Sequence, residues 1–200
     1  MFGELRRIYF LHLPKSAGTS IRYWLWDAFS IEDFLECHHL PQLQVIDSTK
    51  LYQAMFYSGH FGVKLWDILP SHPVTLALLR EPLKRVFSEL SYLRSMSEDQ
   101  VRQLQPGSWT DPTYAELVRS RELSTLLKSK LYIGGFANMQ VRFLGGDPPN
   151  GDLSFVSGAT FDRARWALEA LDMFGIFERM PESLLMFCQR LCWPPVTSLA

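Results

Sequence analysis

Two short apolar stretches, Ile8–Leu13 and Val74–Leu79, limit most strongly what this chain can fold into. The first is rich in aromatic and β-branched residues, and the second is apolar at nearly every position, so both are typical of buried strands. A strand that is apolar on both faces needs cover on both sides, which a parallel sheet obtains from the helices that connect its strands. We therefore predict an α/β fold in which helices flank both faces of a parallel sheet.

The rest of the chain alternates between expected strands, helices and connections. Two further strands are predicted over 56–61 and 173–177, and helices over 21–29, 47–55, 82–94, 123–131, 137–144, 162–171 and 181–193. Asp111–Pro112 is a typical helix start, while 34–51, 95–107 and 145–152 are expected to be mainly irregular. We find no internal repeat and no domain boundary, so residues 1–200 are expected to form one domain.

The charge balance and the cysteine count narrow the function classes. The chain has 20 Lys+Arg against 21 Asp+Glu, so it lacks the basic field that holds a nucleic-acid backbone. Three cysteines cannot form a fully paired disulfide framework, which favours reduced thiols and the cytoplasm. No apolar run approaches the roughly 20 residues that cross a bilayer, so we expect no membrane span.

A first candidate anion site is the small-residue loop from Pro14 to Ser20. A loop between a strand and a helix exposes successive backbone N–H groups, and the helix start adds partial positive charge. Gly18 lets a phosphate approach the backbone, Thr19 and Ser20 offer hydroxyls, and Lys15 adds a full charge. The arrangement is P-loop-like, but Lys15 precedes the glycine instead of following it as in G-x-x-x-x-G-K-[ST]. A plain strand-to-helix turn is the alternative interpretation.

A second candidate anion site begins at Arg80, which follows the strand Val74–Leu79 directly. Ligands of open α/β sheets bind at the carboxyl ends of strands, and Ser88 lies about two helical turns after Pro82. Arg80 and Ser88 could therefore share one anion, with Arg85 as a further candidate. A cation stands where magnesium-dependent NTPases commonly place Asp, which favours phosphate binding without a metal. A structural salt bridge, for example with Glu81, is the alternative role for Arg80.

Both segments resemble motifs of the PAPS-dependent sulfotransferases, where PAPS is 3'-phosphoadenosine 5'-phosphosulfate. Residues 8–21, IYFLHLPKSAGTSI, resemble the 5'-phosphosulfate loop, most closely in the heparan sulfate 2-O-sulfotransferase-like and bacterial family 2 type. Residues 78–88, LLREPLKRVFS, resemble the 3'-phosphate motif, although the family usually has Asp where Glu81 stands. Weaker similarities cover 138–144 and 175–183.

The resemblance implies a role for each of these residues. Lys15 would contact the bridging and sulfuryl oxygens of PAPS, and Arg80 with Ser88 would hold the 3'-phosphate. The 5'-phosphate would be held by the backbone amides and hydroxyls of the loop, that is by Ser16, Ala17, Gly18, Thr19 and Ser20. A lysine and oriented amides can stabilise the departing phosphate without a metal, so no metal is expected.

His60 is the expected general base. Residues 57–61, YSGHF, resemble the Gly-His segment that supplies the base in this family. An acceptor hydroxyl loses its proton as it attacks, and histidine titrates in the range that this step needs. A histidine that only completes local hydrogen bonding is the alternative.

Other polar residues have weaker claims. Cys37, His38 and His39 lack a fourth metal ligand at a recognised spacing, and His12 is expected to be structural. Glu36 is an alternative base. Gln140 and Arg142 are candidates for lining the nucleotide site, while Trp24, Trp26, Cys188 and Cys192 are expected in the core.

The resulting expectation is a sulfotransferase-like domain acting on a hydroxyl of a small-molecule, carbohydrate or acyl-chain acceptor. Two other functions stay open, a P-loop-like kinase of a small molecule or nucleotide and a non-catalytic binding protein on the same scaffold. Family members generally continue beyond the helix that we expect to end near Trp193. The chain is therefore expected to be a compact, truncated or degenerate member. Acceptor identity, adenine contacts and oligomeric state are not encoded in a readable motif.

Overall fold

A computed structural model describes residues 6–35, 37, 39–103, 115, 118, 119, 122, 137–146 and 156–196. The chain divides into two compact units, which we describe separately. The first comprises Met1–Glu81 with Trp166–Ala200, and the second comprises Pro82–Arg165.

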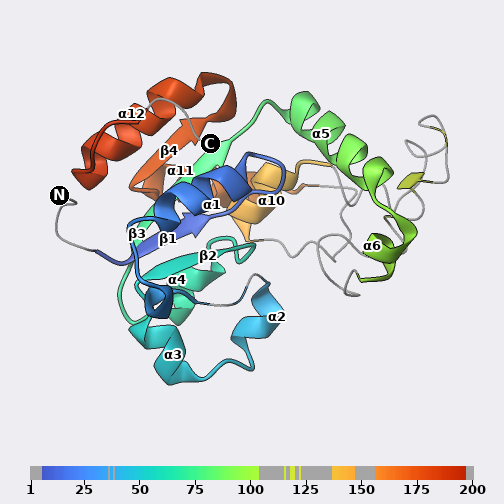
Figure 1. Cartoon of the computed structure of the whole chain (residues 1–200). Coiled ribbons are helices and arrows are strands. Elements are labelled where there is room, and N and C mark those ends of the chain that lie inside the picture. The colour runs from blue at the N-terminus through green and yellow to red at the C-terminus, as the bar shows by residue number, and fades with distance from the viewer. Residues whose placement is uncertain are drawn as a thin grey trace. The chain divides into compact units, whose positions relative to one another are not determined.

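A four-stranded sheet forms the centre of the first unit (Figure 1). Its strands are β1 (Ile8–Leu11), β2 (Phe56–Gly59), β3 (Val74–Leu79) and β4 (Met173–Ile176), in the order β2-β1-β3-β4. All three strand pairs are parallel, and Leu11 lies opposite both Gly59 and Ala77. The carboxyl ends of β1, β2 and β3 therefore meet at one edge of the sheet. The predicted α/β class is confirmed, and β3 has its predicted bounds.

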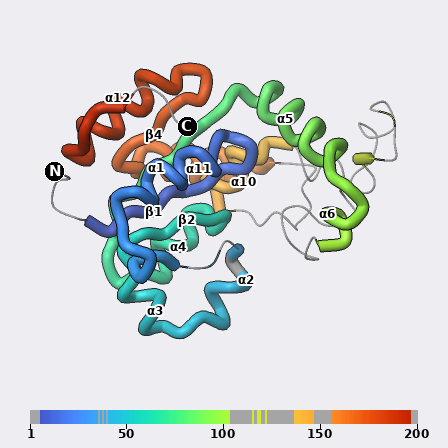
Figure 2. Tube along the Cα trace, in the orientation of Figure 1, coloured from blue at the N-terminus to red at the C-terminus, as the bar shows by residue number. Residues whose placement is uncertain are grey.

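Helices α1 (Gly18–Trp26) and α12 (Met180–Leu191) cover one face of this sheet. Ile21 and Leu25 of α1 join Leu184 and Phe187 of α12 in a core with alternate residues of the strands. The trace in Figure 2 shows these blue and red segments, far apart in sequence, in the same unit. The large apolar area buried here, at roughly 25 cal/mol per Å², is the main source of stability for the layer.

The opposite face is covered by α3 (Ser48–Gln53) and α4 (Lys64–Ile68). Polar tips of aromatic side chains fix this layer, because a buried O–H or N–H needs a partner. The hydroxyl of Tyr57 donates to the Leu51 carbonyl at 2.8 Å, and the indole N–H of Trp66 donates to Thr75 Oγ1 at 2.9 Å. Helices thus lie on both faces, as the apolar strands predicted.

Three short elements complete the first unit. They are η1 (Ile31–Asp33), α2 (Leu40–Leu43) and η2 (Phe177–Arg179). An Asp33 carboxylate oxygen accepts from the backbone N–H and the hydroxyl of Ser30, so a capping box starts η1 inside a segment predicted only as irregular.

The second unit contains α5 (Pro82–Ser95), α6 (Glu98–Arg102), α10 (Met139–Gly145) and most of α11 (Gly158–Ala170). Its apolar cluster comprises Leu90, Leu93, Met96, Val101, Ala115 and Val118. α6 corrects the expectation of an irregular connection over 95–107, because Ser97 and Gln100 form a capping box that starts a helix. The predicted helix over 123–131, the helix start at 111–112 and most of the 145–152 loop lie outside the described residues. None of the described helices combines the length and the apolar character needed to span a membrane.

Candidate functional site

The loop after β1 has an unusual backbone. Lys15 has φ of 64° and Ala17 has φ of 55°, so two non-glycine residues with one residue between them occupy the left-handed region. Each such residue costs roughly 1–2 kcal/mol, because Cβ crowds the following carbonyl oxygen. Left-handed residues alternating with ordinary ones turn successive backbone N–H groups toward one side and form an anion-binding concavity. The loop therefore has the backbone form that the anion-site prediction requires.

Helix α1 begins at Gly18, three residues earlier than predicted. Ala17 is its N-cap and makes no side-chain capping bond, so neither Thr19 nor Ser20 caps the helix. Both lie in the first turn instead, where backbone N–H groups have no partner within the helix. The positive end of a nine-residue helix is thus directed at the loop.

Ser16 adds an unsatisfied hydroxyl between the two left-handed residues. Its side chain is 1% exposed, and no residue that the structure describes gives its Oγ a hydrogen-bond partner. A buried hydroxyl left in this way costs about 1–3 kcal/mol, so native proteins rarely keep one without a function. A ligand oxygen in the loop would satisfy it.

The packing of His12 against Gly18 is a second reason for glycine at this position. A Cβ on Gly18 would lie 1.6 Å from Nε2 of His12, so the imidazole of His12 fills the place where a side chain would stand. The approach of a phosphate to the backbone is the reason expected from the sequence for this glycine. The structure adds a close contact between the end of β1 and the start of α1.

Arg80 lies beside the loop. Its Nη1 donates to the Lys15 carbonyl at 2.9 Å, and its Cζ lies 4.3 Å from the ring centroid of Phe177. The guanidinium thus joins the carboxyl end of β3 to the loop after β1. The neighbouring backbone N–H of Glu81 donates to the Glu178 carboxylate at 3.2 and 3.3 Å.

His60 follows β2 directly and lies at the same edge of the sheet. Its Nδ1 lies 2.9 Å from the backbone oxygen of His12. A carbonyl can only accept, so Nδ1 carries the proton, and in the neutral ring the lone pair belongs to Nε2. This is the tautomer that a general base needs.

Two further histidines lie beside His60, an arrangement that was not predicted from the sequence. The ring of His12 lies 4.5 Å from that of His60, and the ring of His39 lies 5.5 Å from it. The parallel register brings His12 and His60 together, since both follow paired strands. The placement of His39 depends on an isolated bridge to His60 that no local pattern indicates.

The other candidates are the anion-binding residues of α5, the residues expected to line the nucleotide site, and the possible metal ligands and nucleophiles. Ser88 and Arg85 lie on α5 in the second unit, where Arg85 pairs with Glu89 and both side chains are buried. Arg142 is buried in the same unit and donates to the Ala137 carbonyl at 3.2 Å. Arg142 and Gln140, the two candidates for lining the nucleotide site, both lie on α10.

The third group concerns metal and nucleophile candidates. Burial raises the pKa of the Cys37 thiol to about 11, so this thiol is protonated at neutral pH, which disfavours a nucleophilic role. His38 and Glu36 lie outside the described residues. Within the described part of the chain, no three His, Cys, Asp or Glu side chains are arranged to hold a metal ion. All three cysteines are free thiols.

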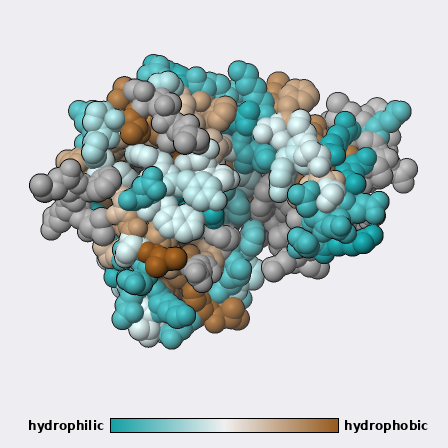
Figure 3. Space-filling view, viewed as in Figure 1, coloured by the Kyte–Doolittle hydropathy of each residue, from teal (hydrophilic) through white to brown (hydrophobic). Residues whose placement is uncertain are grey.

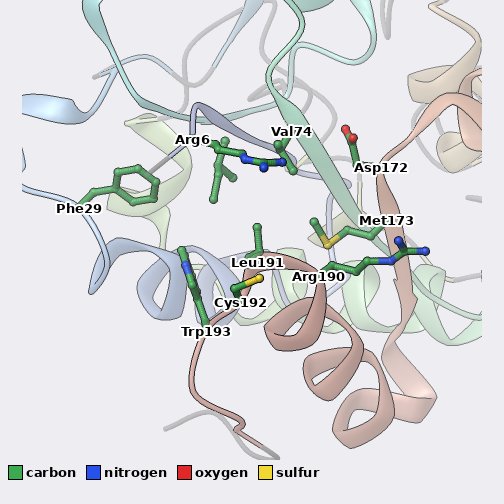
Figure 4. A pocket seen from close by; sticks show the side chains of 10 residues that line it. Arg6, Phe29, Val74, Asp172, Met173, Arg190, Leu191, Cys192 and Trp193 are labelled. Carbon is green, nitrogen blue, oxygen red and sulfur yellow. The ribbon is translucent and has the colours of Figure 1, made fainter. Parts of the chain in front are cut away.

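Two cavities open in the first unit. The larger, about 420 Å³, lies at the amino ends of the strands and is lined by Ile8, Val74 and Met173 among others. Figure 4 shows Arg6 lying across it, while the side chain of Arg190 extends away from Arg6. The smaller, about 360 Å³, lies between α1 and β2 and includes Arg22 and Ser58. The smaller cavity lies between β2, which His60 follows directly, and α1, which follows the Lys15 loop.

Comparison with known proteins adds no family to this geometry. No protein-family model matches the chain, and no curated protein is significantly similar to it.

Proposed function

We propose that the chain is a sulfotransferase that moves a sulfuryl group from PAPS to a hydroxyl of an acceptor. The observation that carries the proposal is the meeting of the Lys15 loop, Arg80 and His60 at one edge of the sheet. The motif resemblance of residues 8–21 and 78–88 supplies the identity of the donor. We further propose the cytoplasm as the compartment, because the three cysteines are free thiols.

The loop residues would bind the 5'-phosphosulfate. The backbone N–H groups from Ser16 to Ser20 and the buried Ser16 hydroxyl would donate to phosphate oxygens. Lys15 would neutralise the negative charge that develops on the oxygen of the departing phosphate. Preorganised donors of this kind are worth roughly 10²–10³ in rate each, because they need no rearrangement during reaction.

His60 would act on the acceptor. As the acceptor oxygen forms its bond to sulfur, the bond between sulfur and the bridging phosphate oxygen breaks, and Nε2 of His60 takes the acceptor proton. The products are a sulfate ester and 3'-phosphoadenosine 5'-phosphate, and the imidazolium then returns its proton to water. The hydrogen bond from Nδ1 to the His12 carbonyl holds the ring for this step.

Arg80 would have two roles under this proposal. One N–H of its guanidinium holds the Lys15 carbonyl and thereby the strained loop. Its fork of donors would also bind the 3'-phosphate. No metal is proposed.

Titration calorimetry with 3'-phosphoadenosine 5'-phosphate, without magnesium, tests the donor site. We expect saturable binding that is weakened at least tenfold in Lys15→Ala and is unchanged in Lys64→Ala, a lysine on α4. Binding of ATP only with magnesium, and none of the bisphosphate, would instead favour the kinase. Binding of the bisphosphate without sulfuryl transfer to any acceptor would favour the non-catalytic alternative.

A further inference from the structure

Three segments form the walls of the smaller cavity. They are α1, the edge strand β2 and the segment from η1 to Leu35, which runs beside β2. Backbone hydrogen bonds fix that segment, from Leu35 N–H to the Phe56 oxygen at 3.1 Å and from Met55 N–H to the Asp33 oxygen at 2.9 Å. A small-molecule site is usually preformed in this way, with a volume of roughly 300–1,000 Å³. At about 360 Å³ the cavity suits a compact ligand.

The cavity continues the histidine cluster along α1 and β2. Gly18, Arg22 and Trp26 are four residues apart and lie on one side of α1, rising about 6 Å per step. Along β2 and the bridge residue that follows it, the alternate residues Phe56, Ser58 and His60 are spaced about 6.6 Å per step. The helix of a parallel crossover runs back along its strands, so the two series match level by level. His60 and Gly18 meet at His12, Ser58 and Arg22 line the middle, and Phe56 and Trp26 line the far end.

Polarity changes along this series. Five of the seven side chains that line the cavity are apolar, and the two polar ones are Arg22, one turn after Gly18 on α1, and Ser58, two residues before His60. At the far end Phe34 lies with its ring centroid 4.7 Å from Trp26 and 5.1 Å from Phe56. Ile31 borders the cavity and is 72% exposed. The surface visible in Figure 3 is mixed, with groups of brown, white and teal atoms.

We infer that this cavity binds the apolar body of the acceptor, and that the acceptor is a compact aryl or alkyl alcohol whose hydroxyl points toward His60. The inference rests on the proposed function, since His60 is the base only in that reaction. Ser58 and His60 are two residues apart, so an acceptor whose ring or short chain lies against Trp26, Phe34 and Phe56 would direct its hydroxyl past Ser58 toward the imidazole. A saccharide would leave most of its hydroxyls without partners in a lining with only two polar side chains.

Equilibrium dialysis with 2-naphthol, using the full chain, tests the cavity separately from the nucleotide site. We expect saturable binding, weakened roughly tenfold or more in Trp26→Ala, which removes an aromatic wall, and in Ile31→Glu, which places a charge at the apolar rim. Val45→Glu is the matched control, because Val45 is 85% exposed and does not line the cavity. N-acetylglucosamine should not bind. With PAPS present, the two cavity variants should raise KM for 2-naphthol by a similar factor and leave KM for PAPS unchanged.

The outcomes separate the two proposals. Absence of saturable naphthol binding, or binding that neither Trp26→Ala nor Ile31→Glu weakens, overturns the cavity assignment even where the bisphosphate binds. Naphthol binding without any bisphosphate binding contradicts the sulfotransferase proposal and, with it, the acceptor role. Transfer to saccharides but not to naphthol also overturns the inference, because the acceptor class is then wrong.

Discussion

The two edges of the sheet differ in how their polar and strained groups are used. At the carboxyl edge, Lys15 and Ala17 are strained and the buried hydroxyl of Ser16 lacks a partner among the described residues. At the amino edge, the cavity is larger, but the Asp172 carboxylate already accepts the Thr75 N–H at 2.7 Å. The size of a cavity is therefore a poorer guide to function here than strain and unsatisfied donors.

Left-handed backbone at the amino edge has an ordinary explanation. Cys192, with φ of 56°, ends α12, and the next N–H, that of Trp193, donates to the Cys188 carbonyl at 2.8 Å. A left-handed residue that closes a helix in this way satisfies carbonyls that would otherwise have no partner. No such capping role explains Lys15 and Ala17, which precede a helix instead of ending one.

Among the tests that compare the two edges of the sheet, the largest effect is expected on the rate of sulfuryl transfer. We expect Lys15→Ala to lower kcat roughly 10²–10³-fold and His60→Ala roughly 10²–10⁴-fold, while Arg190→Ala at the amino edge leaves kcat within twofold. Transfer assays with labelled PAPS measure all three. A loss of transfer in Arg190→Ala equal to that in Lys15→Ala would remove the distinction between the edges.

Gly18→Ala tests the packing of the carboxyl edge. The new methyl group meets the imidazole of His12, so we expect the free energy of unfolding to fall by roughly 1–3 kcal/mol. The loss should be less than half as large in a His12→Ala background, which denaturant melts of the double-mutant cycle can measure. Gly158→Ala is the control, since nothing lies within 4 Å of the position of its Cβ. Equal losses in both backgrounds would show that His12 is not the obstacle.

Alkaline pH should distinguish the buried thiol of Cys37 from the exposed thiol of Cys192. Burial raises the pKa of Cys37 from an ordinary 9.0 to about 11, so above pH 9 the unfolded chain loses this proton before the folded chain does. Stability should therefore fall as pH rises, by about 1 kcal/mol between pH 9 and 10. Denaturant melts should show a shallower fall in Cys37→Ala and an unaltered one in Cys192→Ala. An identical slope in wild type and Cys37→Ala would contradict this burial effect.

The smallest expected effect is the gain in stability when a left-handed residue is replaced by glycine. Glycine removes a left-handed penalty of roughly 1–2 kcal/mol but adds chain entropy of roughly 0.5–1 kcal/mol, so Ala17→Gly and Cys192→Gly should each stabilise by about 0.5 kcal/mol. Thermal melts measure that gain. Calorimetry should show weaker bisphosphate binding only in Ala17→Gly, because the loop loses its preorganised form. Weaker bisphosphate binding in Cys192→Gly as well would contradict the distinction between the two edges of the sheet.

Much of the fold was predictable because its signals are local. The apolar run Val74–Leu79 predicted β3 residue by residue, since a strand buried on both faces has few polar positions. The start of α1 was misplaced by three residues, because it depends on the left-handed cap at Ala17, which nothing in the sequence marks. Helix α4 was missed altogether; it has only five residues.

Sequence by itself determined the α/β class and the order of a strand, a small-residue loop with Lys15, and a helix. Those features follow from side-chain periodicity and from the residues that loops tolerate, both of which act over a few neighbours. Only the tertiary structure decided that Arg80 holds the Lys15 carbonyl, that His12 and His39 flank His60, and that Arg22 and Ser58 line one cavity. These contacts join segments far apart in the chain, and their geometry is set by strand register and helix packing, which no local pattern records.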